Sequence, residues 1–220
     1  MLRRLLALTL TVATVAATSL RAQSPVSGTV QTSGTFTAIT GIGAGGYIGS
    51  ATITGATLPG SGPFQIFCTD KNNSITLGGS AFAAWITPLW GGDVTRTRLG
   101  GDNNPSLAGI QPLTANALAI YRSNASLAAQ LPTASAAFRA TLQDQIWQNA
   151  EAPFNHALFG NANFNATGWY VITQVSAVGN DHVGVQELLA FRPVPEPSTY
   201  AMMGTGLALL VLAARRRRAA

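Results

Sequence analysis

The 220-residue sequence contains one cysteine, one lysine and few charged side chains, and these scarcities exclude whole classes of protein. One cysteine cannot form a disulfide within the chain, so a disulfide-stabilised scaffold is excluded. Charged residues make up 10% of the chain, well below the roughly 25% of an average soluble domain. This composition argues against an ordinary cytosolic domain.

The formal net charge of +5 comes from the two ends of the chain. Three arginines lie within the first 21 residues, and four more stand near the C-terminus at Arg215, Arg216, Arg217 and Arg218. Between residues 23 and 192, six positive charges face seven carboxylates, so this part is close to neutral. Nucleic-acid binding needs lysines and arginines clustered on the folded part, so the sequence predicts no nucleic-acid partner.

The N-terminus has the layout of a secretory signal peptide. A positively charged start is followed by a short apolar run and then by small residues. We expect residues 1–22 to be the signal peptide, cleaved after Ala22, with cleavage after Ser19 or Ala17 as the alternatives. An uncleaved membrane anchor is disfavoured because the apolar run is short for a bilayer. The Sec translocon and signal peptidase are therefore expected partners.

The C-terminus carries a second signal with three parts. Two prolines precede an uncharged, apolar segment at residues 198–214, which the arginine block follows directly. The segment is at the lower limit of what crosses a hydrocarbon core of roughly 30 Å. Arginine blocks stay on the cytoplasmic side, which places the rest of the protein outside the inner membrane. A buried core helix is the alternative, and the terminal arginines argue against it.

This tail resembles the PEP-CTERM sorting segment of Gram-negative bacteria that make exopolysaccharide. The resemblance rests on the apolar segment, the terminal arginines and the motif Pro195, Glu196, Pro197 and Ser198. In that family an exosortase, a membrane transpeptidase-like enzyme, processes the exported protein near the motif. The resemblance implies that residues 193–218 anchor the protein in the inner membrane until it passes to the cell surface or extracellular matrix. Exopolysaccharide or another surface ligand is the candidate target of the exported part at residues 23–192.

The body, residues 23–192, is predicted to be one α+β domain with a β-sandwich or barrel-like part. Short β-prone runs between turn residues occupy residues 23–90 and 165–192. Residues 113–131 and 135–149 are rich in helix formers and predict two central helices separated by a proline. We expect the strands on both sides of the helices to share a sheet, with the helices packed over one side or end of it.

Several short patterns that carry chemistry in other proteins are interpreted here as structural. The G-x-G-x-x-G string at residues 41–46 is followed by β-prone residues, which argues against dinucleotide binding. The polar run that begins at Asp70 lacks the glycine and glutamate of a calcium loop, so an ordinary turn is favoured. His156 and His182 have no cysteine or carboxylate beside them at metal-binding spacing. The sequence therefore predicts no metal site and no cofactor.

One pair of residues suggests chemistry. Cys68 ends an apolar strand, and Gln143 lies in the second helix with Ile146 and Trp147 on its side of that helix. An aromatic-Cys segment followed by an apolar-Gln-x-x-apolar-Trp helix resembles the thioester domains of bacterial surface adhesins. The resemblance implies that the Cys68 sulfur and the Gln143 carbonyl join with loss of ammonia, in a site from which water is excluded. Gln145, in the same helix, is a second candidate.

The structural alternative is a core helix in which Phe138, Leu142 and Ile146 pack inward and Gln143 lies at the margin. Two functions remain open at this point. The first is an exported envelope or matrix protein whose body is a non-enzymatic binding or structural module. The second is a covalent adhesin with a Cys68–Gln143 thioester. A secreted hydrolase is less favoured, because neither paired carboxylates nor a nucleophile–base motif emerges, so we predict that the body is not an enzyme.

Overall fold

The computed structural model describes residues 24–33, 48–59, 62–71, 79–101, 113–151, 157–179, 184, 186–193 and 205–208. The chain divides into a unit formed by Gln23–Pro193 and a second unit formed by Met1–Ala22 with Val194–Ala220. The first unit, which contains the body at residues 23–192, carries the fold. The predicted signal peptide, the sorting motif, the terminal arginines, the string at residues 41–46 and both histidines lie outside the described residues.

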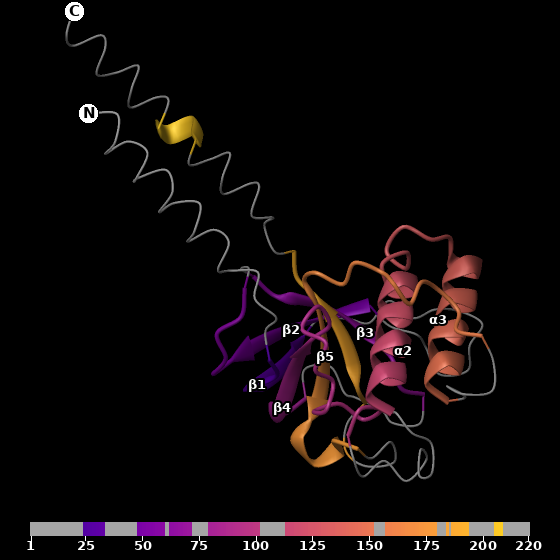
Figure 1. Cartoon of the computed structure of the whole chain (residues 1–220), viewed down its shortest axis with the longest axis horizontal. Coiled ribbons are helices and arrows are strands. Elements are labelled where there is room, and N and C mark those ends of the chain that lie inside the picture. The colour runs from indigo at the N-terminus through magenta and orange to yellow at the C-terminus, as the bar shows by residue number, and fades with distance from the viewer. Residues whose placement is uncertain are drawn as a thin grey trace, which may run out of the picture. The chain divides into compact units, whose positions relative to one another are not determined.

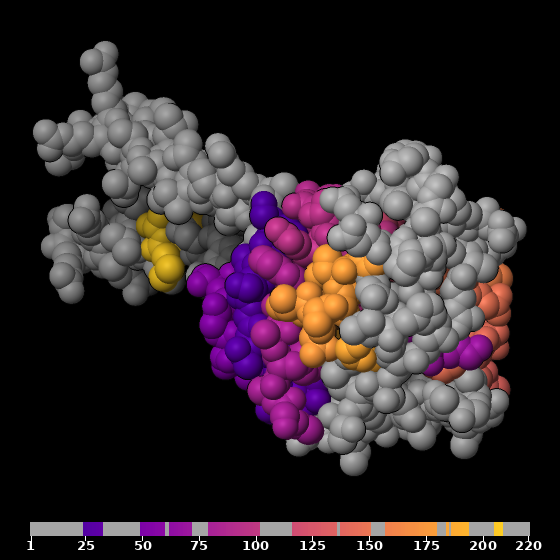
Figure 2. Space-filling model, turned by 90° about the horizontal axis from the view of Figure 1, so that it is seen from below, coloured from indigo at the N-terminus to yellow at the C-terminus, as the bar shows by residue number. Residues whose placement is uncertain are grey.

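Six antiparallel strands close into a barrel (Figure 1). Their order around the barrel is β1-β2-β3-β6-β5-β4, and Figure 2 shows the indigo β1 between the violet β2 and the magenta β4. The prediction of a β-rich domain with a barrel-like part is confirmed. The strands are β1 (Val26–Ser33), β2 (Ile48–Thr54), β3 (Phe64–Cys68), β4 (Phe82–Pro88), β5 (Trp169–Gln174) and β6 (Leu188–Phe191), with a 3-10 turn, η2 (Val175–Ala177), after β5.

The strands that precede the helices pair directly with those that follow them, as the sequence predicts. Strand β3 pairs with β6, placing Cys68 opposite Leu188, and β4 pairs with β5, placing Ile86 opposite Ile172. These four residues belong to one buried cluster to which all six strands contribute, so they point into the barrel. The end of β3 therefore places the single cysteine in the barrel interior.

Two helices cover one side of the barrel (Figure 1). They are α2 (Leu113–Ala128) and α3 (Ala136–Glu151), which confirms both predicted helices. A second buried cluster joins them to outward-facing side chains of β3, β5 and β6. Each side chain buried fully in such a cluster contributes about 1.5–3 kcal/mol to folding. The barrel members are Phe67, Trp169, Val171 and Leu189, and the helix members include Ile120, Tyr121, Leu142, Ile146 and Trp147.

The buried face of α3 differs from the one that the sequence predicts. Leu142 and Ile146 are buried, but Phe138 is 49% exposed, so its predicted inward packing is wrong. Phe138 lies in the first turn of α3, before the stretch that meets the core. Gln143 is 0% exposed and therefore lies within the buried face instead of at its margin.

Candidate functional site

Cys68 lies at a strand end where two distant segments meet. It is the last residue of β3, and its side chain is completely buried. Opposite it stands Leu188, the first residue of β6. In an antiparallel pair, side chains on diagonal positions of one face come into reach of each other. Gln186, two residues before Leu188, is thereby brought to Cys68.

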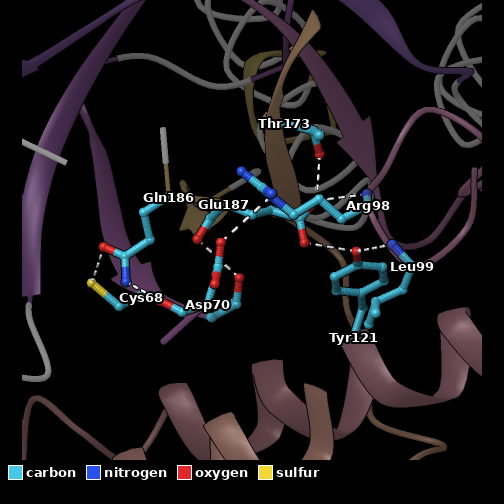
Figure 3. A network of polar contacts seen from close by, with 9 residues as sticks. Cys68, Asp70, Arg98, Leu99, Tyr121, Thr173, Gln186 and Glu187 are labelled. Atoms are coloured by element: carbon cyan, nitrogen blue, oxygen red, sulfur yellow. Dashed lines mark hydrogen bonds and ion pairs between the residues drawn. The ribbon is translucent and has the colours of Figure 1, made fainter. Parts of the chain in front are cut away.

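The thiol of Cys68 contacts the carboxamide of Gln186 (Figure 3). Sγ donates a hydrogen bond to Oε1 of Gln186 over 3.1 Å. The Nε2 amide group of Gln186 in turn donates to the main-chain oxygen of Asp70. This bond orients the carboxamide with its oxygen toward the sulfur. Because a C=O bond measures about 1.2 Å, the sulfur lies no more than about 4.3 Å from the carbonyl carbon. Cys68 and Gln186 are called the Cys–Gln pair below.

Gln143 reaches the same cysteine from α3, at a different atom. Its Nε2 donates to the main-chain oxygen of Cys68 over 2.9 Å. Trp147, one turn further along α3, is buried on the same side of the helix, whereas Gln145 is only half-buried. The structure therefore brings the predicted partners Cys68 and Gln143 together, but the contact of the sulfur itself is with Gln186.

Glu187 anchors the segment that carries Gln186. Its Oε1 accepts hydrogen bonds from the Thr173 hydroxyl at 2.6 Å and from the main-chain N–H of Arg98 at 2.9 Å. Its Oε2 accepts from the Tyr121 hydroxyl at 2.7 Å. These bonds tie β5, α2 and the turn around Arg98 to one buried carboxylate (Figure 3).

Hydrogen bonds to the main chain also hold the residues next to the Cys–Gln pair. The carbonyl oxygen of Glu187 accepts hydrogen bonds from both the N–H and the hydroxyl of Thr69. Thr69 follows Cys68 and Glu187 follows Gln186, so these bonds hold the neighbours of both members of the pair. Asp70, next along the chain, forms a buried ion pair with Arg98 at 3.5 Å. A buried pair of this kind stabilises little by itself, and it connects Arg98 to the residue whose main-chain oxygen binds Gln186.

Burial shifts the pKa of three titratable groups, two of which belong to this network. Burial raises the pKa of Glu187, and the positive charge of Arg98 opposes that rise. Burial also raises the pKa of Tyr121 well above its ordinary value of 10.0, and the nearby Glu187 carboxylate adds to the effect. Burial raises the pKa of Tyr170, inside the barrel, to about 12. Both tyrosines therefore keep their protons in the folded protein at pH values where an unfolded chain loses them.

These tyrosines predict a loss of stability in alkali. Above the ordinary tyrosine pKa the folded state binds more protons than the unfolded state. The contribution of these tyrosines to stability is therefore fully present below about pH 10 and falls as the pH rises further. We expect the free energy of unfolding to drop by up to about 1.4 kcal/mol per pH unit for each tyrosine. Urea unfolding on either side of pH 10 measures this drop. Tyr121→Phe should show a smaller drop, and an equal drop in the variant would contradict the assignment to Tyr121.

Gln186 is the functional candidate that sequence reasoning missed. It lies 118 positions from Cys68, and only the β3–β6 register brings the two together. One signal was available, because Gln186 and Glu187 are a polar pair directly before the apolar run of β6. The sequence predicted that strands before and after the helices share a sheet, but it could not predict the register of β3 against β6.

Two further structural findings concern only the described residues. No group of three or more His, Cys, Asp or Glu side chains among them could hold a metal ion. None of the helices in these ranges combines the length and apolar character needed to cross a bilayer. Of the predicted spanning segment at 198–214, residues 205–208 are described, and they are helical.

Comparison with known proteins identifies the C-terminal segment. Residues 193–218 match the family described as the PEP-CTERM protein-sorting motif. This match confirms the resemblance found in the sequence, and the motif indicates an exported protein that an exosortase processes at the membrane. Neither a curated protein nor a solved structure matches the chain.

Proposed function

We propose that this chain, which carries a PEP-CTERM sorting motif, is a surface protein whose body attaches covalently to its target. The attachment uses an internal thioester between Cys68 and Gln186. The observation that carries this proposal is the buried contact of 3.1 Å between the thiol and the carboxamide oxygen. The sorting motif supports a target outside the cell, because it indicates that the protein is exported.

Thioester formation at this site is a balanced exchange. Sγ of Cys68 attacks the side-chain carbonyl carbon of Gln186, and the carbon–nitrogen bond breaks. The thiol proton passes to the departing nitrogen, which leaves as ammonia. Cys68 is 0% and Gln186 is 7% exposed, so bulk water is largely kept from the acyl carbon. Exclusion of water from a closed site prevents premature hydrolysis of a reactive intermediate.

The thioester then serves a single reaction with the target. A nucleophile on the target attacks the acyl carbon, the carbon–sulfur bond breaks, and a proton from the nucleophile restores the Cys68 thiol. The product is an amide or ester bond between side chain 186 and the target. Because each molecule reacts once, the body is a binding module and not an enzyme, and the reaction needs no metal or cofactor.

The Cys68–Gln143 thioester, which the sequence offered as the alternative to a non-covalent module, is the second candidate. Gln143 is buried at the same cysteine, which favours it over Gln145. Its carboxamide, however, is bound to the main-chain oxygen of Cys68, whereas Gln186 is bound to the sulfur. The geometry therefore favours Gln186 as the acyl donor.

Intact mass spectrometry of the exported body, purified in buffers free of amines, tests this proposal. The mass should be lower than the sequence mass of the mature body by one ammonia, and thiol reagents should not modify Cys68. Incubation with methylamine should add the whole mass of methylamine and expose the thiol. Cys68→Ala is the control, which should keep the full mass and take up no methylamine. A full-mass wild-type body with a reactive thiol would overturn the proposal and favour a non-covalent module.

A further inference from the structure

Strand β6 lies between the proposed covalent bond and the C-terminal sorting segment. Gln186, the proposed acyl donor, stands two residues before β6 (Leu188–Phe191), and the sorting motif begins at residue 193. The target would be bonded to side chain 186, and the motif indicates attachment at the membrane through the segment after β6. A pull between the target and the cell therefore acts on the two ends of one short strand.

The backbone of β6 has almost no length left to release under such a pull. An antiparallel strand rises about 3.4 Å per residue, and a fully extended chain reaches at most about 3.6 Å per residue. The hydrogen bonds that join β6 to β3 and β5 run across the strands. Because both attachment points lie on the same strand, the pull does not slide β6 along its neighbours. It is carried by the covalent bonds of the backbone.

A buried side chain fixes the start of this segment in the barrel. Glu187 directly follows the acyl donor and is 3% exposed. Its carboxylate accepts hydrogen bonds from the hydroxyls of Tyr121 and Thr173 and from the main-chain N–H of Arg98. Hydrogen bonds to a charged group stabilise by about 1.5–3 kcal/mol each. The chain next to the proposed bond is therefore held by α2, β5 and the turn around Arg98.

Arg192 fixes the other end of the segment, directly before the sorting motif. Its main-chain N–H donates to the carbonyl oxygen of Gly168 at 3.0 Å, and its Nη1 donates to the carbonyl oxygen of Gly62 at 3.3 Å. Its guanidinium carbon lies 4.1 Å from the centre of the Phe64 ring. Such a cation–π contact stabilises by about 0.5–2 kcal/mol. These contacts tie the end of β6 to the segments that lead into β3 and β5.

We propose that β6 is the part of the body that bears tension, so that a pull passes from side chain 186 to the sorting segment without crossing the rest of the barrel. This inference rests on the proposed thioester at Gln186. The covalent path between the two attachment points runs through residues 186–193 alone. Strands β1 to β5 and both helices precede residue 186, so they lie outside the path and stay folded under load. A bond at Gln143 would instead place the second half of α3 and all of β5 under tension.

Single-molecule pulling on the exported protein tests this inference. The protein is produced without an exosortase, so that its C-terminal segment remains, and is bound to a surface through its C-terminus. A probe tip that carries a primary amine on a flexible linker reacts with the thioester, and the extension is recorded until an attachment breaks. The steps should release no more than about 100 Å in total, the most that the residues after 193 supply at about 3.6 Å each.

The matched control is the same protein held by its N-terminus. The covalent path to side chain 186 then crosses every strand from β1 to β5 and both helices. Unfolding of these elements should release on the order of 500 Å, at about 3.6 Å for each residue in the path. The same bond is therefore expected to unfold the body from one end of the chain and to leave it folded from the other.

The outcomes separate this inference from the function on which it rests. Capture of the tip followed by a release well beyond about 100 Å from the C-terminal attachment would overturn the inference and leave the thioester standing. A release of roughly 250 Å is the length expected for a bond at Gln143. A wild-type protein that captures the tip no more often than Cys68→Ala would overturn both the thioester and the inference.

Discussion

Replacing Gln186 with leucine should leave Cys68 as a thiol in every molecule, whereas the wild-type protein should have lost one ammonia from each. Leucine has a similar volume but no side-chain carbonyl carbon, so it fills the space and cannot form a thioester with Cys68. The substitution also removes the hydrogen bond from Gln186 to the buried Asp70 carbonyl, and the loss of one partner of such a bond costs about 1–3 kcal/mol of stability. The fold should therefore persist, and intact mass with thiol labelling measures the change.

The matched control for this experiment is Gln143→Leu. Gln143 contacts the main-chain oxygen of Cys68, so its loss should slow thioester formation but still allow it. The opposite pattern would contradict the assignment: a thiol in every molecule of Gln143→Leu, together with loss of ammonia in Gln186→Leu. That pattern would favour the Cys68–Gln143 bond that the sequence suggested.

Replacing Pro195, Glu196 and Pro197 together with alanines should keep the protein in the inner membrane. The PEP-CTERM motif indicates processing by an exosortase, and the alanine variant loses the residues that give the motif its name. The apolar segment at residues 198–214 and the terminal arginines remain to retain the protein. Immunoblots of inner-membrane, outer-membrane and medium fractions measure where the body is found.

Two comparisons make the sorting experiment decisive. Cys68→Ala alters the body and leaves the motif intact, so it should be released in the same way as the wild type. Release of the alanine variant at the wild-type level would contradict the role assigned to the motif. Retention of both variants would instead point to a fault in folding or export.

The secondary structure of the body was largely predictable because it depends on local sequence. Residues 113–131 and 135–149 contain strong helix formers bounded by prolines, and α2 and α3 lie there. The strands at β3 and β5 are short apolar runs between turn residues, which is a local signal as well. Phe138 was the exception, because which turn of α3 meets the barrel depends on contacts between distant segments.

The site was only half predictable for the same physical reason. Cys68 and Gln143 stand in recognisable local patterns, and the structure places them in contact. Gln186 belongs to no such pattern, because its place beside the sulfur depends on the register of β3 against β6. A shift of one residue in that register would turn Gln186 to the other face of the sheet. The hydrogen bonds between Thr69 and Glu187 help to hold the register that is observed.

The proposed thioester is tested most directly by locating methylamine after it reacts with the exported wild-type protein. The amine becomes bonded to the carbon that formed the thioester, so tandem mass spectrometry of the digested protein identifies the acyl residue. We expect side chain 186 to carry methylamine and Cys68, a thiol again, to be open to alkylation. Methylamine on side chain 143 would contradict the assignment of the acyl donor, and the absence of methylamine from every peptide would contradict the thioester itself.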